Sequence, residues 1–395
     1  MTLHSDIWRL PGPGGFAREV AHLAGGGQHV LAVIPRYIAD NPSYSDTLAV
    51  AVQNELDDPR RLYPASSQGS LAGSLGFNMT DDFDGAPVTV SDLLTHGDVA
   101  GRIFVCNATD LDSAHMSELP TFLRRLDDES RSVPSSVRAT MIFILNHGLL
   151  PQDPASVATA RVWYWDRVAR WDVAALLAGH SVADDLAGVL GEVRLETIIE
   201  AARWDFELAI KIAQDWSGEN QEIAAILNRN GRPSPTGKAV RQVAQKRPPE
   251  AQIAAWDSGG LESWHGVCSI RPEFFIERHD GAVGIFWSAQ SRVLLPWLEI
   301  QRVHVEAIIR EKLGSDKMNA AVELYSTRYP DIEYDATLVE FSTLARIVNA
   351  RFGRSEQRLQ DTTGLLRSAR NRLAHLDPLS RDELHQLVQT CAWLG

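Results

Sequence analysis

The sequence contains few cysteines and no long apolar run. Its three cysteines, Cys106, Cys268 and Cys391, lie far apart in 395 residues. They therefore fit neither a disulfide framework nor a clustered metal site, and we expect them to be small buried hydrophobic residues. No stretch is long and apolar enough to cross a bilayer, and residues 1–10 lack the basic and then apolar pattern of a secretory signal. The sequence thus predicts a cytoplasmic protein without membrane contact.

The sequence also has fewer basic than acidic residues. The chain has 38 Lys and Arg against 51 Asp and Glu, which gives a formal net charge of −13. The average field of such a surface does not attract nucleic acid, so any contact with RNA must come from a local basic patch. Residues 228–247 contain basic residues and no acid, and we interpret them as a solvated linker. Residues 351–372 repeat arginine against only Glu356 and Asp361.

The length predicts more than one domain. In residues 1–150, apolar strand-like runs at 29–35, 102–106 and 140–145 alternate with helical patterns, which indicates an α/β domain. Residues 151–227 are predicted to be a helical domain, and residues 228–282 a basic linker of ambiguous structure. Residues 283–395 show five helical patterns, at 285–313, 315–328, 336–352, 362–376 and 380–394, and predict a helical bundle. Large apolar anchors are expected in the first helical region: Trp163, Trp165, Trp171, Trp204 and Trp216.

The order of elements in residues 1–150 resembles that of P-loop NTPases of the STAND or AAA kind. In that family, a G-x-x-x-x-G-K-[ST] loop follows the first strand, its backbone N–H groups surround the phosphates and its lysine neutralises them. Here residues 35–49 lack both glycines, and Asp46 occupies the place of the lysine. Asp110 and Asn146 follow the next strands, where a magnesium-linked aspartate and a sensor residue would stand; they could equally be ordinary loop residues. The resemblance implies a degenerate NTPase-like domain that neither hydrolyses nucleotide nor needs a cofactor.

A second glycine-rich stretch, at residues 11–15, lies just before a predicted helix. Glycines at a helix N-terminus can bind anions. The strand that should precede a phosphate-binding loop is barely present in residues 7–10, so this stretch is the weaker of the two candidate phosphate sites.

The fourth helix of the C-terminal bundle carries a polar motif. Asp361, Thr362 and Thr363 are expected to cap its N-terminus, and Asp377-Pro378 to end it. A helical wheel places Leu365, Leu366, Ala369, Leu373 and Leu376 on an inward arc. Arg367, Asn371 and His375 follow one another at i, i+4 and i+8 on the opposite face, and Arg370 lies at the border.

Residues 370–375, Arg-Asn-Arg-Leu-Ala-His, resemble the R-N-x-x-x-H motif of HEPN domains, which are all-helical modules with the motif late in the bundle. The long helical pattern at 289–311 also resembles a first HEPN helix. The resemblance implies metal-independent RNA cleavage by a homodimer in which two motifs meet. Arg370 would hold phosphate, Asn371 would orient it, and His375 would transfer protons. Contacts with RNA are expected from Arg367, Arg372, Glu299 and Arg302.

Two functions remain open on this evidence. In the first, the chain is a HEPN endoribonuclease that acts on RNA, such as tRNA, under the control of the NTPase-like sensor domain, in bacterial antiphage defence or a toxin–antitoxin system. In the second, it is a non-catalytic adaptor that docks other defence-system proteins. The intact motif favours the first function, and Asp46 with the missing glycines favours a docking role for the N-terminal domain.

Overall fold

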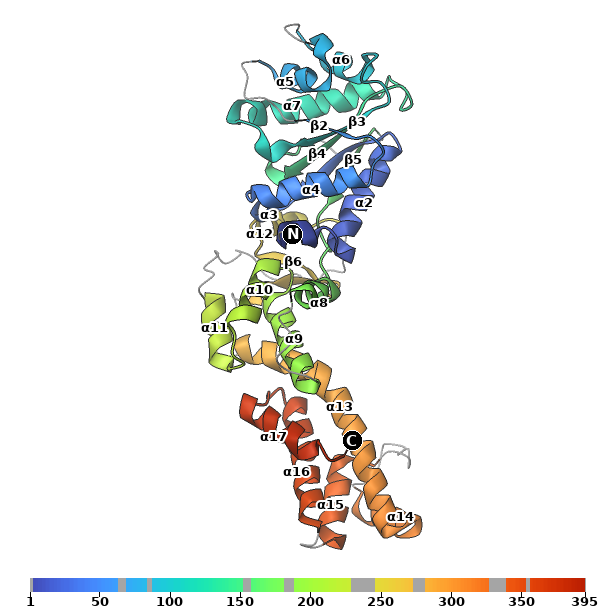
Figure 1. Ribbon diagram of the computed structural model, residues 1–395, viewed down its shortest axis with the longest axis vertical. Helices are drawn as coiled ribbons and strands as arrows, with labels where there is room; N and C mark the ends of the chain where they lie inside the picture. The colour runs from blue at the N-terminus through green and yellow to red at the C-terminus, as the bar shows by residue number, and fades with distance from the viewer. Residues whose placement is uncertain are drawn as a thin grey trace. The chain divides into compact units, whose positions relative to one another are not determined.

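A computed structural model (Figure 1) describes residues 3–62, 69–83, 87–151, 158–180, 188–228, 246–272, 281–326, 339–352 and 356–394. The chain forms two compact units. Unit 1 comprises Met1–Leu176 and Arg232–Arg271, and unit 2 comprises Leu177–Gly231 and Pro272–Gly395. Unit 1 therefore extends past residue 150 and takes in a second, distant stretch of the sequence.

The centre of unit 1 is a five-stranded parallel sheet with the strand order β2-β3-β4-β1-β5, an order like that of P-loop NTPases. Its strands are β1 (His29–Ile34), β2 (Arg60–Leu62), β3 (Ile103–Asn107), β4 (Thr140–Asn146) and β5 (Thr159–Trp163). The three apolar strands expected from the sequence are confirmed. They are continuous apolar runs because helices cover both faces of a parallel sheet, and every residue of β1 is buried.

Helices pack on both faces of this sheet (Figure 1). The helices of unit 1 outside the distant stretch are α1 (Leu3–Ile7), α2 (Pro11–Gly25), α3 (Arg36–Ala39), α4 (Pro42–Asn54), α5 (Leu71–Met79), α6 (Val90–Thr95), α7 (Ser113–Ser130) and the greater part of α8 (Arg170–Gly179), which crosses the unit boundary after Leu176. The right-handed crossovers from β1 through α4 and from β3 through α7 run in opposite directions along the sheet, so these two helices lie on opposite faces.

The distant stretch of unit 1 contributes α12 (Ile253–Asp257) and a hairpin of β6 (Leu261–Trp264) and β7 (Val267–Ile270). Both hairpin-turn residues, His265 and Gly266, have positive φ angles of 56° and 73°. Paired positive φ angles are the geometry of a two-residue turn that matches the twist of the strands. The sequence left this stretch ambiguous.

The prediction that residues 151–227 are helical is wrong at β5. Its sequence, Thr-Ala-Arg-Val-Trp, is rich in β-branched and aromatic residues and lies beside β1 in the sheet. Burial of the tryptophan anchors is confirmed for Trp163, Trp165, Trp204 and Trp216, but Trp171 is 68% exposed near the start of α8. Its indole is instead stacked by the guanidinium of Arg170.

Unit 2 is helical. Its helices are α9 (Val189–Ala202), α10 (Phe206–Asp215), α11 (Asn220–Asn228), α13 (Gly281–Leu313), α14 (Ser315–Tyr325), α15 (Phe341–Arg351), α16 (Gln357–Ala374) and α17 (Arg381–Cys391). The last five correspond to the five helical patterns predicted from the sequence, with ends that differ by a few residues. Among the described helices of the whole chain, none combines the length and the apolar character needed to cross a membrane.

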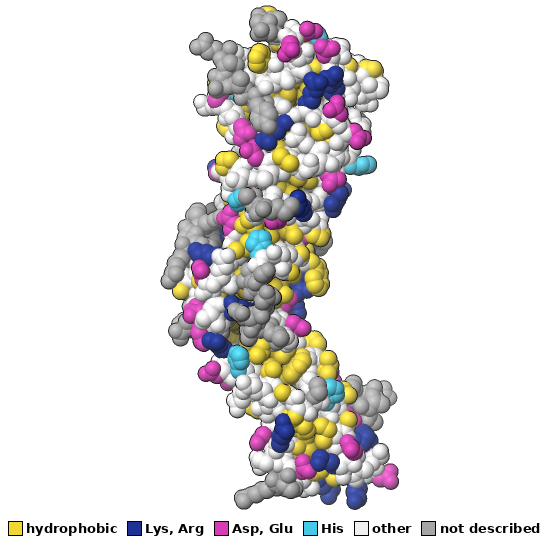
Figure 2. Space-filling model, in the orientation of Figure 1, with side chains coloured by type: hydrophobic (Ala, Val, Ile, Leu, Met, Phe, Trp, Pro, Cys, Tyr) yellow, Lys and Arg dark blue, Asp and Glu magenta, His cyan; other side chains and the backbone are white. Residues whose placement is uncertain are grey.

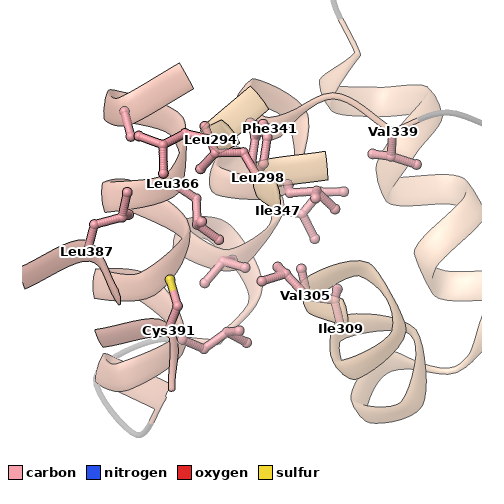
Figure 3. Close-up of a cluster of buried hydrophobic side chains, with 14 of the residues drawn as sticks. Leu294, Leu298, Val305, Ile309, Val339, Phe341, Ile347, Leu366, Leu387 and Cys391 are labelled. Atoms are coloured by element: carbon pink, nitrogen blue, oxygen red, sulfur yellow. The ribbon is translucent and has the colours of Figure 1, made fainter. Parts of the chain in front are cut away.

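An apolar core joins α9 and the last five helices of unit 2. Figure 3 shows side chains of α13, α15, α16 and α17 pointing toward one another, including Leu298, Ile347, Leu366 and Leu387. Cys391 belongs to this core, and Cys106 is buried in the sheet of unit 1, as expected for small hydrophobic residues. Cys268 in β7 is only partly buried.

Candidate functional site

Helix α16, which carries the motif, is longer at its N-terminus than the sequence indicates. It begins at Gln357, so the prediction that Asp361, Thr362 and Thr363 cap it is wrong. The two threonine hydroxyls lie inside the helix and donate to carbonyl oxygens one turn back, Arg358 O at 2.8 Å and Leu359 O at 2.7 Å. Thr and Ser can make this bond in a helix as well as at a cap, which is why the sequence misplaced the start.

The inward face of α16 is largely the one predicted. Leu366, Ala369 and Leu373 are buried, and Leu365 is partly buried against the core. Leu376 is 61% exposed, contrary to the prediction. The helix has already ended at Ala374, so the wheel that places Leu376 inward no longer applies.

The motif side chains lie on the solvent side of the last two turns of α16. Arg367, Arg370, Asn371 and His375 are all exposed. The closest contact within the motif is a long one, from Arg370 Nη1 to Asn371 Oδ1 at 3.5 Å. Within the described residues, the side chains of Arg367 and His375 have no hydrogen-bond or ion-pair partner. The helix therefore presents two guanidinium groups, an amide and an imidazole that are available for an external ligand.

The end of α16 fixes the position of His375. His375 is the C-cap, and Asp377 N donates to Arg372 O at 3.0 Å, while Leu376 N donates to Leu373 O at 3.3 Å. This pair of bonds is a Schellman motif, in which the residue after the cap adopts a left-handed conformation. Leu376 takes that position with a φ of 62°, where glycine is the usual residue.

Arg372, which the sequence assigned to RNA, is engaged within the chain. Its Nε donates to Asp377 Oδ2 at 2.6 Å, its Nη2 donates to Pro378 O at 2.6 Å, and its Nη1 pairs with Glu383. The guanidinium lowers the pKa of the Asp377 carboxyl through the hydrogen bond between them. Arg372 thus binds the loop that follows the motif, and its guanidinium is not exposed to solvent in the way that those of Arg367 and Arg370 are.

Two residues of α13 that were not predicted from the sequence hold the end of α16 and the loop that follows it. Trp287 Nε1 donates to the carbonyl of Leu373, one of the last carbonyls of α16, at 2.7 Å. Gln290 is 1% exposed and makes two hydrogen bonds with the backbone of Leu379. The signal that could have pointed to this role is the position of Gln290 on the apolar face of the helix, four residues after Phe286 and four before Leu294.

Glu299 and Arg302, the candidate partners on α13, form a separate ion-pair cluster. Arg302 is 5% exposed, and its guanidinium donates to Glu299 at 2.6 Å and to Glu306 at 3.0 Å. A third bond, at 3.1 Å, reaches the carbonyl of Val339. The structure does not bring this cluster together with the motif: by the rise of an α-helix, Arg302 lies roughly 18 Å along α13 from Gln290.

A groove of about 750 Å³ lies between α16 and α17. Its lining includes Arg358, Asp361, Gly364, Gln386 and Gln389, and it belongs to the half of α16 away from the motif. Figure 2 shows separate basic side chains over the helices of unit 2 on this side of the molecule, rather than one continuous basic face.

In unit 1, the segment after β1 does not form an open phosphate loop. Pro35 is followed at once by the short helix α3, and α4 starts at Pro42. Asn41 caps α4 by accepting the N–H of Ser43 at 3.1 Å, and Pro42 has no N–H to donate. Asp46 lies a full turn inside α4, so neither it nor a lysine in its place would stand at the helix N-terminus.

The acidic candidates of unit 1 do come together. Asn107 Nδ2 lies 3.0 Å from Asp110 Oδ2 and 3.4 Å from Asp46 Oδ1, and Asp46 forms an ion pair with Arg61 of β2. Partial burial, and then the neighbouring Asp46 carboxylate, raise the pKa of Asp110. Asn146 ends β4 elsewhere along the same edge of the sheet. Arg61 supplies a charge that neutralises Asp46 within the chain, without any ligand.

The glycine-rich stretch at residues 11–15 and the segment after β1 both resemble phosphate sites. At each of them a carboxylate of the chain itself accepts a hydrogen bond from a backbone N–H. The N–H of Gly12, in the first turn of α2, donates to Asp172 Oδ1 at 2.9 Å. The N–H of Arg36, which opens α3, donates to Asp257 Oδ1 at 2.9 Å. These backbone donors are therefore satisfied internally.

No protein-family model matches this chain, and no curated protein matches it in sequence.

Proposed function

We propose that this chain is a metal-independent endoribonuclease of the HEPN type, with Arg370, Asn371 and His375 as its catalytic residues. The observation that carries the proposal is the exposure of these side chains at the end of α16, where Trp287 bonds to the helix end and Arg372 and Gln290 bond to the loop that follows. Arg372 and Arg302, by contrast, are held in ion pairs within the chain.

The chemistry of RNA cleavage without a metal fits these groups. A base removes the proton of a 2′-OH, the 2′-oxygen attacks the adjacent phosphorus, and an acid protonates the 5′-oxygen that leaves. Imidazole suits both proton transfers because its ordinary pKa lies near neutral pH. The planar guanidinium of Arg370 can donate two hydrogen bonds to the phosphoryl oxygens, and the Asn371 amide can orient either group.

One chain supplies one His375, whereas the reaction needs a base and an acid. A homodimer with the two α16 ends facing each other across a two-fold axis would supply both from identical residues. The exposure of the motif supports this arrangement, since these side chains remain free to meet a second copy. Arg367, one turn before Asn371, would extend the cationic surface along the bound RNA.

Unit 1, in this proposal, is a degenerate P-loop NTPase-like sensor that restrains or positions the nuclease without binding nucleotide. Its strand order supports the resemblance, and the occupied donors of Gly12 and Arg36 support the loss of phosphate binding. Such a fusion suits bacterial antiphage defence or a toxin–antitoxin system. RNA, including tRNA, would be its substrate and other defence-system proteins its partners.

A second candidate function is a non-catalytic adaptor. The observation that favours it is the internal occupation of both phosphate-like positions in unit 1, which leaves that unit as a docking surface. In that case the motif face of α16 would bind a partner protein, and the chemistry would belong to another subunit.

The test is cleavage of RNA by the purified full chain in the presence of EDTA, with total tRNA and a single-stranded oligonucleotide as substrates. We expect wild-type protein to leave a 5′-hydroxyl end, and His375→Ala and Arg370→Ala to reduce the rate by at least about 100-fold. Matched controls are His385→Ala on α17 and Arg351→Ala on α15, which should retain the wild-type rate. Wild-type protein that cleaves neither RNA, alone or with extract from infected cells, would favour the adaptor.

A further inference from the structure

The groove between α16 and α17 is a second feature of unit 2 that the motif residues do not use. Figure 1 shows the two helices side by side. The groove has a volume of about 750 Å³, and its lining comes from the first half of α16 and the last turns of α17. Sites of this volume are typical of proteins that bind small ligands. The groove is therefore large enough for a ligand of the size of one nucleotide.

Gly364 lies in the middle of α16 and lines this groove. Glycine is a poor helix former, and a helix gains stability when alanine replaces it, unless something lies close to the backbone. Among the described residues, no atom lies within 4 Å of the position that a Cβ of residue 364 would take. Packing within the chain thus gives no reason for a glycine here. The glycine instead keeps the α16 side of the groove open to an external ligand.

The groove is lined by hydrogen-bonding groups that the chain leaves available. Gln386 and Gln389 are exposed on α17, and their side-chain amides have no hydrogen-bond partner within the described residues. Each amide presents donors and an acceptor side by side. On α16, Asp361 Oδ1 accepts a hydrogen bond from Gln357 Nε2 at 2.8 Å, and the second carboxylate oxygen remains available to a ligand.

Arg358 supplies a cation at one end of the groove. Its guanidinium lies over the ring of Trp393, 4.9 Å from the ring centroid. Trp393 Nε1 donates to Thr362 Oγ1 at 3.1 Å, which fixes the ring against α16. In the part of the chain that the structure describes, the Arg358 guanidinium has no ion-pair partner, so it can hold a phosphate. The charges of Arg358 and Asp361 balance, and hydrogen-bonding groups therefore decide what the groove selects.

The groove is continuous with the surface that carries the motif. Gln360, Gly364, Arg367 and Asn371 follow one another at i, i+4, i+7 and i+11, so they lie along one side of α16. By the rise of an α-helix, Gly364 lies roughly 10 Å before Asn371. A single strand of RNA whose scissile phosphate is held at Arg370 can therefore reach the groove with a neighbouring nucleotide.

We propose that the groove between α16 and α17 binds an unpaired base of the RNA substrate and prefers a base with an exocyclic amine to uracil. This inference rests on the proposed nuclease function. Single-stranded RNA is recognised through hydrogen bonds to the edges of unstacked bases. The amine of adenine can donate one hydrogen to a glutamine oxygen and the other to the Asp361 carboxylate, which only accepts. Uracil presents a carbonyl oxygen at the same position, and that oxygen repels the carboxylate.

The experiment is fluorescence anisotropy with labelled oligoadenylate and oligouridylate, measured on full-length His375→Ala so that the RNA is not cut. We expect oligoadenylate to bind at least about 5-fold more tightly than oligouridylate. Gly364→Leu occupies the groove with a side chain and Gln389→Leu removes an amide, so each should abolish most of this preference. Ala320→Leu is the matched control, because Ala320 is exposed on α14 outside the groove, and it should keep the preference.

Gly364→Ala distinguishes a binding role from a structural one. Its melting temperature should rise, because alanine favours the helix and its Cβ meets no described atom within 4 Å. Its preference for oligoadenylate should nevertheless fall, by about 2-fold or more, since the methyl group narrows the groove. A residue with only a structural role would not change the two quantities in opposite directions. Should Gly364→Leu fail to fold, Gln389→Leu provides the same test on an exposed residue.

The outcomes separate this proposal from the proposed function. Cleavage of RNA by the wild type, together with equal affinity for the two oligonucleotides or a preference that both variants retain, would overturn the groove proposal and leave the nuclease intact. Groove-dependent binding by a wild type that cleaves no RNA would overturn the nuclease and support the groove as a binding site. A protein that binds neither oligonucleotide would overturn the groove proposal.

Discussion

Gln290 holds the backbone of Leu379 at both of its polar groups, with Nε2 donating to the carbonyl at 2.8 Å and Oε1 accepting the N–H at 2.7 Å. Both residues are buried, at 1% and 4% exposure. Gln290→Ala would leave a buried N–H and a buried carbonyl without partners, which costs about 2–4 kcal/mol. We expect the unfolding free energy of unit 2 to fall by that amount in urea denaturation. The control is Gln386→Ala, on the exposed side of α17, which should change stability by less than about 0.5 kcal/mol.

Leu376 occupies the left-handed position of the Schellman motif, and its side chain is largely in solvent. Leu376→Gly should therefore stabilise unit 2 by about 1 kcal/mol, because glycine adopts this φ without steric cost and little burial is lost. Ala374→Gly, in the last turn of the same helix, should have the opposite sign and a similar size. Thermal unfolding of both variants checks the pair, and a destabilised Leu376→Gly would show that the Leu376 side chain has an essential contact.

Glu262 predicts how the stability of unit 1 depends on pH. Burial raises its pKa from 4.5 in the unfolded chain to about 8 in the folded protein, so between these values the folded state holds a proton that the unfolded state has lost. Stability from this group is complete below about pH 4.5 and disappears as the pH rises through 8. The loss is on the order of 5 kcal/mol for a shift of this size.

We therefore expect the unfolding free energy of unit 1 to fall between pH 5 and pH 8.5, and Glu262→Gln to flatten that slope. The two proteins are compared by the slope of unfolding free energy against pH and not by their stability at one pH. The reason is that an amide nitrogen cannot accept a hydrogen bond from the Trp256 N–H, so the variant loses that bond at every pH. Urea denaturation at several pH values tests this. A wild-type slope that Glu262→Gln leaves intact would assign the pH dependence to other groups, of which Asp110, Asp172 and Asp257 have raised pKa values as well.

Gly12 and Gly15 form a matched pair within the first turns of α2. A Cβ at Gly12 would lie 1.8 Å from the carbonyl oxygen of Arg167, whereas a Cβ at Gly15 meets only the flexible end of Arg18 at 3.9 Å. Gly12→Ala should destabilise unit 1 by about 3 kcal/mol, since backbone must move to make room. Gly15→Ala should stabilise it by about 0.5–1 kcal/mol through helix propensity. Equal effects in thermal unfolding would contradict the close approach at Gly12.

The sequence predicted the features that depend on local apolar patterns. The runs at 29–35, 102–106 and 140–145 are strands because a parallel sheet buries both faces, and an uninterrupted apolar run records that burial. Exposure of Arg367 and Asn371 was predicted as well, because the 3.6-residue period of a helix fixes which positions share a face. His375 is exposed as predicted, but as the residue that caps the helix.

The missed features depend on contacts between distant segments. β2 has only three residues, of which two are arginines, so it shows no apolar pattern. β5 was predicted to be helical because the tryptophans in and after it are equally compatible with a helix. The roles of Gln290 and Arg372 require knowledge of where residues 376–380 run. Asp257 accepts a hydrogen bond from a backbone N–H that lies 221 residues away in the sequence, and Asp172 accepts one from a backbone N–H 160 residues away. No local sequence pattern connects residues so far apart.

The interleaving of the two units has a practical consequence for anyone who divides the chain. Because Arg232–Arg271 folds with the N-terminal sheet, a fragment that starts after Leu176 would carry Trp256 and Trp264 without the surface that buries them. Such a fragment invites aggregation. A fragment that starts at Pro272, with residues 188–231 supplied as a separate chain, leaves α8 uncut and omits that stretch, and co-expression of the two pieces is the route to an isolated nuclease candidate.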